Sequence, residues 1–138
     1  MIALLLALQA VPTTPPVLGP IGQQALPASG CAAYLWSLAG DRTLVAMASA
    51  TPARIRVAVD GSPPADLAWA SGEGMPALGL APVSTYKAAD VTVTLALTIT
   101  TRPDLKAGAV VSQGTLTVER PNRDTLVLPV GGLVGCAG

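Results

Sequence analysis

The chain contains no histidine, and this absence removes several kinds of functional site at once. Ser–His and Cys–His nucleophile pairs, imidazole metal ligands and the usual proton shuttle near neutral pH all need that side chain. The two cysteines cannot replace it in a metal site, because two thiolates alone leave a tetrahedral zinc ion short of ligands. We therefore expect no catalytic residues, no metal site and no cofactor.

Charge is also scarce, because only 12% of the 138 residues are charged and eight basic side chains balance eight acidic ones. A nucleic-acid-binding surface needs a basic stripe to neutralise phosphates, and an anionic membrane surface needs a similar patch. No such cluster of Lys and Arg occurs; Arg54 and Arg56 share one strand face and could bind an anion. The sequence argues against nucleic acid as a partner and leaves an unknown protein or a component of the cell envelope.

The carboxylates are isolated from one another and fall mostly in predicted turns or at strand ends, where aspartate caps backbone N–H groups. Asp60 and Asp66 could share a calcium ion, but the residues between them lack the dense oxygen spacing of a calcium loop. Ser71 lacks the preceding Gly-x of a nucleophile elbow. We predict that the protein is not an enzyme. The remaining enzymatic alternative is a hydrolase whose fold brings two carboxyl groups together in a cleft.

Apolar residues make up 51% of the chain, although there is no phenylalanine and only two Trp and two Tyr. Such a content excludes wholesale disorder, and the length favours a single domain. The clearest pattern runs over residues 90–101, where branched apolar residues at odd positions alternate with threonines and one alanine. Because successive side chains of a strand point to opposite faces, this stretch predicts a strand with an apolar core face and a hydroxyl-rich outer face.

Shorter runs bounded by Gly or Pro predict further strands at residues 31–38, 43–49, 54–59, 65–70, 114–120 and 124–130. The first run would also suit one or two helical turns, and residues 102–108 are typical of a single helical turn. Strands at short, regular spacing predict an all-β fold, either an antiparallel β-sandwich or a small β-barrel of about seven or eight strands. Pro129 indicates that the last strand is an edge strand or ends early.

The last two predicted strands form a hairpin whose register the sequence constrains. Pairing Val118 with Leu126 keeps the apolar residues of both strands on one face. The same pairing sets Arg120 opposite Asp124 and leaves a three-residue loop with Arg123 in its left-handed position.

The first 40 residues carry no charged side chain. Residues 1–10 hold a short apolar run followed by a small residue, which predicts a signal peptide with cleavage after Ala10. An ordinary apolar first strand is the alternative, because the positive n-region of a signal peptide is missing. Residues 11–30 contain five prolines and three glycines without alternation, which predicts an extended, polyproline-like tether ahead of a single all-β domain at residues 31–138.

The only two cysteines, Cys31 and Cys136, flank the strand-rich region, and behind a signal peptide they predict a disulfide that joins its ends. The alternatives are a pair of free buried thiols in a protein that is not exported, and lipidation of Cys31, because residues 28–31 resemble a bacterial lipoprotein processing box. The apolar run is far shorter than the roughly 20 residues that span a bilayer, so we expect no transmembrane span. The expected location is periplasmic or secreted.

Three side chains are candidates for contact with a partner, namely Trp69, Glu73 and Tyr86. Trp69 lies beside a Gly- and Pro-rich loop at residues 71–82, and Trp is enriched at binding hot spots. Its spacing from Leu67 also suits a position in the core.

Cysteines at both ends of the domain, the run Trp69-Ala70-Ser71-Gly72 and a later Tyr86 resemble features of the small bacterial lysozyme inhibitors. The resemblance rests on these few positions. It implies a periplasmic inhibitor of a cell-wall hydrolase that works through a loop such as residues 71–82. From the residues themselves we predict an exported, non-enzymatic β-domain that acts as a binding or structural module, with the inhibitor as the alternative.

Overall fold

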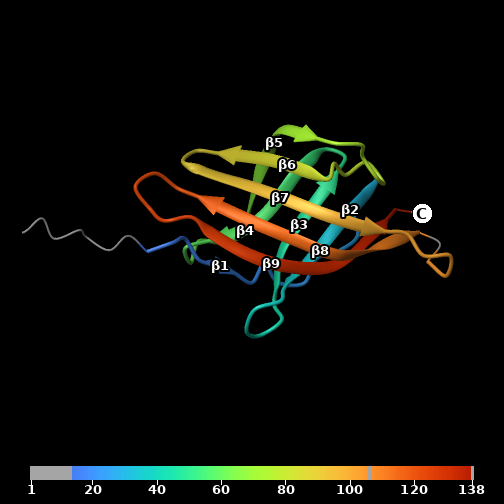
Figure 1. Ribbon diagram of the computed structural model, residues 1–138, viewed down its shortest axis with the longest axis horizontal. Helices are drawn as coiled ribbons and strands as arrows, with labels where there is room; N and C mark the ends of the chain where they lie inside the picture. Colours follow the sequence, from blue (N-terminus) through green and yellow to red (C-terminus); the bar gives the residue numbers. More distant parts are fainter. Residues whose placement is uncertain (1–13, 106, 138) are drawn as a thin grey trace, which may run out of the picture.

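Nine β-strands and no helix make up the part of the chain that the computed structural model describes, residues 14–105 and 107–137 (Figure 1). The predicted signal peptide lies outside these residues. The strands are β1 (Leu18–Gly19), β2 (Cys31–Ser37), β3 (Leu44–Ala50), β4 (Ala53–Val59), β5 (Ala65–Glu73), β6 (Val83–Ala88), β7 (Val91–Thr100), β8 (Gly108–Glu119) and β9 (Leu126–Cys136). The prediction of an all-β fold is confirmed.

Eight of these strands close into a barrel. From β2 to β9 each strand pairs antiparallel with the next one along the chain, and β9 pairs back with β2. β1 adds two residues beside the end of β4 as an extra short strand. Of the two architectures that the sequence leaves open, the molecule has the barrel, because this ring of pairings does not divide into two stacked sheets.

The interior of the barrel is filled by side chains. In β7 the predicted alternation is present, since Val93, Leu95 and Leu97 are buried and Thr98 and Thr100 are exposed. The other strands contribute in the same way, and the largest fully buried aliphatic side chains of the ring are Leu35, Ile55, Val57, Val93, Leu95, Leu116, Val118 and Val130. A barrel of eight strands is just wide enough for its interior to be packed by its own side chains.

The two ends of the barrel carry different loops. The disulfide end holds the start of β2, the β5–β6 loop (residues 74–82), the β7–β8 connection and the end of β9. The ion-pair end holds the β4–β5, β6–β7 and β8–β9 connections. In Figure 1 the disulfide end is on the right, beside the C-terminus.

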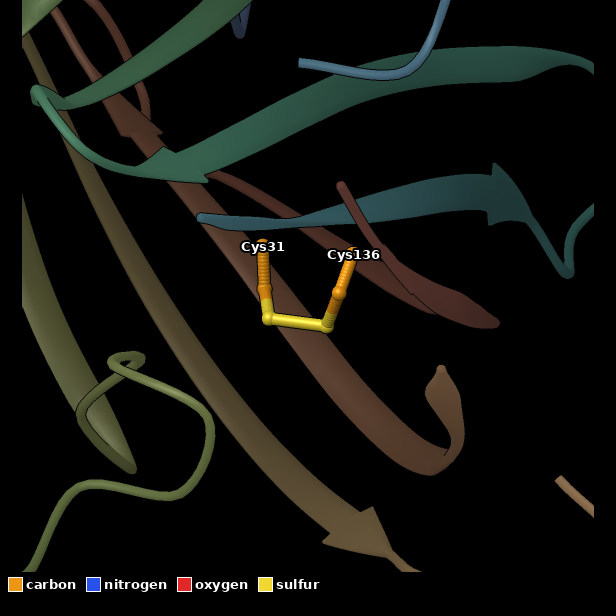
Figure 2. The surroundings of a disulfide bond; sticks show 2 residues. All are labelled: Cys31 and Cys136. Carbon is orange, nitrogen blue, oxygen red and sulfur yellow. A yellow bond between two sulfur atoms is a disulfide. The ribbon is translucent and has the colours of Figure 1, made fainter. Parts of the chain in front are cut away.

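The seam between β2 and β9 closes the barrel and joins the first and last strands of the ring. It consists of seven residue pairs, from Cys31 opposite Cys136 to Ser37 opposite Val130. At its end the two cysteines form a disulfide, with Cα atoms 4.0 Å apart (Figure 2). The predicted disulfide is therefore confirmed. Because Sγ of Cys31 is bonded to Cys136, it is not free to carry a lipid.

Close approach across this seam depends on one glycine. A Cβ added to Gly132 would overlap the backbone carbonyl oxygen of Tyr34 on β2. A Cβ added to the neighbouring Gly131 would meet the side chain of Leu38 at 3.5 Å and the carbonyl oxygen of Val111 at 3.6 Å, which are ordinary contacts. The seam thus requires glycine at position 132 and tolerates a larger residue at position 131.

The helical turn predicted at residues 102–108 is wrong. The backbone N–H of Leu105 donates to the carbonyl of Arg102 in a single turn, and Gly108 already begins β8. The sequence pattern of Pro, Asp and Gly fits this turn as well as it fits a helix start, because the same residues favour both.

The prediction that Pro129 marks an edge strand or an early end is also wrong, because β9 pairs with both β2 and β8 and runs on to Cys136. β2 pairs with β9 only from Val130 onward, so β8 is the one strand paired with Pro129. The missing N–H therefore removes no ladder bond on the β2 side.

The β8–β9 hairpin has the predicted pairing of Val118 with Leu126. The ladder ends there, so the connection is longer than the predicted three residues, and positions 120 and 124 lie in the loop instead of facing each other across the ladder. Asn122, with φ of 60°, takes the left-handed position that was predicted for Arg123. Asparagine tolerates this conformation better than arginine does.

Residues 14–30, the described part of the predicted tether, lie against the outside of the barrel. Ile21 is buried and donates its N–H to the carbonyl of Leu44, and the Tyr34 hydroxyl donates to the carbonyl of Ala25 at 2.8 Å. The apolar side chains that Ile21 joins on the outer face of β2, β3 and β4 are Ala32, Tyr34, Leu44, Met47 and Ala58. This segment therefore covers an apolar outer face of the barrel.

At the ion-pair end, Asp60 joins this N-terminal segment to the β8–β9 loop. Its carboxylate accepts the backbone N–H of Val17 at 3.0 Å and one guanidinium N–H each from Arg120 and Arg123 at 2.6 Å. Arg120 also donates to Asp90 at 3.0 and 3.2 Å. Burial alone would raise the pKa of Asp60, but the hydrogen bonds and the charge of Arg123 lower that pKa below its ordinary value.

Asp60→Asn is expected to lower the free energy of unfolding by about 1–2 kcal/mol at pH 7, because bonds to two charged groups are lost in a cluster that solvent partly screens. Because the pKa of Asp60 is lowered in the folded protein, its carboxylate stabilises the fold at pH values above the unfolded pKa of about 4. This contribution is lost as the pH falls through the pKa of the folded state. Urea unfolding of both proteins at pH 7 and pH 3 measures the effect. A difference in unfolding free energy between the two proteins that is larger at pH 3 than at pH 7 would contradict this expectation.

Candidate binding surface at the disulfide end

Strand β5 extends beyond the strand on one side of it. It pairs with β4 only from Ala65 to Ala68, whereas it pairs with β6 as far as Glu73. Residues 69–73 therefore have a paired strand on one side alone, and all five are exposed. A bulge between Trp69 and Ser71 lies just beyond the last residue pair of β4 and β5. Bulges commonly change the direction of side chains at such places. In Figure 1, β5 is at the top of the molecule with β6 beside it.

The three predicted contact residues lie on β5 and β6. Trp69 is opposite Tyr86 in the ladder, so the fold brings these two together, and Glu73 ends β5 opposite Val83. Trp69 is 45% exposed and Glu73 is exposed, whereas Tyr86 is only 2% exposed. Trp69 and Glu73 are open to a partner, and Tyr86 packs in the core. Contact of the three with a partner stays a prediction.

A cavity of about 200 Å³ opens beside Trp69. Its walls include Ala53 at the start of β4, Leu80 of the β5–β6 loop, and Ser84 and Tyr86 of β6. Burial raises the pKa of Tyr86, and the hydrogen bond with Ser84 acts in the opposite direction, so the phenol is neutral at physiological pH. A mostly apolar lining with a few hydroxyl groups suits an uncharged, largely apolar side chain.

The β5–β6 loop folds back over this end of the barrel (Figure 1). Leu80 is buried in the main core, and Ala77 and Leu80 exchange two backbone hydrogen bonds of 2.9 Å. Met75 and Leu78 remain 87% and 38% exposed. The sequence predicts the loop but does not identify Met75 and Leu78 as exposed side chains. The available signal is two large apolar residues in a Gly- and Pro-rich stretch that has no strand pattern to bury them.

The two arginines considered for anion binding face a carboxylate of their own chain. Arg56 donates to both oxygens of Asp66, at 2.8 and 3.2 Å, and to the side-chain oxygen of Gln24 at 2.6 Å. Arg54 lies 3.5 Å from the same carboxylate. The hydrogen bond from Arg56 holds the pKa of Asp66 below its ordinary value and raises the pKa of Arg56. Asp66 thus occupies the position that an external anion would take.

The two carboxylates considered for a shared calcium ion, Asp60 and Asp66, pair with different arginines. Asp60 is bound by arginines of the β8–β9 loop and Asp66 by Arg56, so each already has cationic partners. Within residues 14–105 and 107–137, no group of three or more Cys, Asp or Glu side chains is placed to hold a metal ion.

Comparison of the chain with protein-family models, with curated proteins and with solved structures found no match. No helix in the described part of the chain is both long enough and apolar enough to cross a membrane. The functional inference therefore rests on the geometry of this molecule.

Proposed function

We propose that the protein is an exported, non-enzymatic binding module that contacts a partner protein or cell-envelope component through its disulfide end. The observation that carries the proposal is the clustering of exposed apolar side chains along the chain. Among the described residues, three of the nine large apolar side chains that are exposed fall within residues 69–78, namely Trp69, Met75 and Leu78. These three side chains lie outside the core cluster, and exposed apolar groups that gather in one part of a surface mark interaction sites.

Export is supported by two features. The Cys31–Cys136 disulfide belongs to the kind that persists in oxidising compartments, and residues 1–10 have the apolar run and small residue of a signal peptide. Both features together support a periplasmic or secreted location.

The chemistry of the side chains supports a role without catalysis. The chain has no histidine to activate a nucleophile, and Asp60 and Asp66 are engaged by arginines. Glu73 is the carboxylate at the disulfide end of β5, and it is exposed to solvent. A hydrolase would instead need two carboxyl groups facing each other across a cleft.

An inhibitor of a cell-wall hydrolase is the second candidate. The observation in its favour is the β5–β6 loop, which presents Met75 at 87% exposure while Leu80 anchors it in the core. An exposed side chain on a loop whose shape is fixed in advance is suited to enter the concave active site of an enzyme. Inhibition of lysozyme by the oxidised protein, lost on substitution of Met75 by lysine, distinguishes this candidate from a module without inhibitory activity.

The proposed surface can be tested by photo-cross-linking in cells of the native host, with p-benzoylphenylalanine in place of Met75. We expect a discrete adduct with a partner, because Met75 lies on the contact surface. The matched control carries the same group in place of Val127, which is 62% exposed on β9. Equal labelling from both positions, or no adduct from position 75, would contradict the proposal.

A further inference from the structure

Two stretches of the barrel have a paired strand on one side alone, residues 69–73 of β5 and the end of β7 beyond Ala96, and of the two only the β5 stretch borders the cavity beside Trp69. Alternate residues of an antiparallel strand direct their N–H and C=O groups to opposite sides, so in residues 69–73 some of these groups point away from β6. No strand among the described residues pairs with them on that side, because β4 begins at Ala53 and its pairing with β5 stops at Ala68. The molecule thus presents a row of unpaired backbone donors and acceptors.

This edge has little of the protection that natural proteins give to exposed strand edges. Residues 69–73 include no proline and no lysine, and the only charged side chain is that of Glu73 at the end. One bulge lies at its start. The neighbouring edge is different, since β1 covers the end of β4 with two residues of the N-terminal segment. The β5 edge is therefore open to a further strand.

The cavity beside Trp69 borders this edge, and the β5–β6 loop also lines it with Pro76, Gly79, Leu80 and Ala81. It is bounded on one side by Ala53, the first residue of β4, and on the other by Trp69 of β5. An added strand would continue the line of β4 beyond Ala53, with side chains of one face directed at this opening. A volume of about 200 Å³ corresponds to about seven waters at liquid density, which is room for one aliphatic or aromatic side chain.

We propose that the β5 edge at residues 69–73 takes up an extended peptide segment of the partner as an added β-strand, with one apolar side chain seated beside Trp69. The inference rests on the proposed function and adds the kind of partner and the mode of binding. The backbone groups select an extended polypeptide, because only another strand supplies donors and acceptors at matching spacing. The cavity selects an apolar residue at one position of that segment.

A second copy of the chain is a poorer occupant of this edge. A stable protein–protein interface uses roughly 20–30 residues on each side. The edge offers five residues, among them one alanine, one serine and one glycine. A peptide that gains backbone hydrogen bonds and fills one pocket needs no larger surface.

The test uses the full oxidised chain and a displayed library of random decapeptides as the probe. The dominant selected peptide is synthesised with an N-methyl group on each backbone amide in turn, and its affinity is measured by titration calorimetry. We expect every second N-methyl group to weaken binding at least about tenfold while the intervening ones leave it unchanged, because alternate amides face the β5 edge. Trp69→Ala should weaken binding about thirtyfold, as expected for a hot-spot side chain.

Two charge variants separate the edge from the rest of the surface. Ser71→Lys places a charge on the open edge and should reduce peptide binding at least about tenfold. Thr94→Lys adds the same charge at a partly exposed position of β7 that is paired with both β6 and β8, and should leave binding unchanged. Circular dichroism of each variant establishes that it is folded.

Four results would overturn strand addition: no enriched peptide, no alternation in the N-methyl series, equal effects of the two lysine variants, or a dimer in solution that buries the edge. None of these affects the cross-link from position 75, which tests the proposed function by itself. If the cross-link forms and the alternation is absent, the binding surface stands and the mode of binding is different.

Discussion

The double variant Cys31→Ala/Cys136→Ala is expected to lose about 4 kcal/mol of unfolding free energy. The disulfide joins residues 105 apart in sequence, and the chain-entropy model gives about 4.7 kcal/mol for a loop of 100 residues, with smaller values measured when the unfolded state retains structure. For a domain of this size the loss corresponds to a fall of roughly 10–15 °C in Tm. Chemical denaturation and calorimetry of both proteins measure it.

Reduction of the wild-type protein provides the matched control. The chain contains only these two cysteines, so a reductant acts on this one bond and should lower the stability by the same amount as the double variant. A double variant as stable as the oxidised wild type would show that the β2–β9 seam holds without the bond.

Gly132→Ala is expected to destabilise the barrel by about 3 kcal/mol, near the upper end of the range for overpacked positions. The added Cβ would overlap the carbonyl oxygen of Tyr34, which belongs to the backbone of β2 and cannot move without displacing the seam. Relative to the wild type, we expect the variant to unfold at a lower urea concentration and to show faster amide exchange along β2 and β9.

Gly131→Ala is the control for this substitution, because it makes the same chemical change one residue away in the same strand. Its added Cβ meets nothing closer than 3.5 Å, so the stability should change by less than about 1 kcal/mol. Equal effects of the two substitutions would mean that the loss comes from the backbone entropy of glycine and not from the close approach of β9 to β2.

Local features of the fold could be predicted because their signal lies within a few neighbouring residues. The alternation at residues 90–101 indicates which side chains of β7 are buried, and the apolar positions of β8 and β9 fix the pairing of Val118 with Leu126. Closure of the barrel could not be predicted, since it depends on β2 pairing with β9 about 100 residues later. Strand periodicity carries no information on which strand is the neighbour.

A bulge in β8 and a long-range ion pair account for two features of the structure that the sequence pattern does not indicate. β8 begins at Gly108, several residues before the predicted start, because the irregularity between Val111 and Gly114 breaks the alternation that marks a strand. The loop between β8 and β9 is longer than predicted, and within it Arg120 bonds with Asp60, which lies 60 residues earlier. No local pattern reports an ion pair of that separation.

The candidate binding surface could be predicted in part from the local spacing of residues along β5. Trp69 and Leu67 lie on the same side of β5, as their spacing predicts, and Leu67 is buried. Trp69 is 45% exposed and lies just beyond the last residue pair of β4 and β5, and the length of a neighbouring strand is a tertiary property. The exposure of Met75 likewise depends on how the loop is anchored, which its sequence does not reveal.

Residue-resolved amide hydrogen exchange tests most directly the central claim, that the barrel is closed at the β2–β9 seam and that residues 69–73 of β5 form an open edge. We expect the ladder amides of β2 and β9 to exchange only through global unfolding. In residues 69–73, the amides that point away from β6 should exchange orders of magnitude faster, while the alternate ones remain protected. Rapid exchange along β2 and β9, or uniform protection across residues 69–73 in the isolated monomer, would contradict the claim.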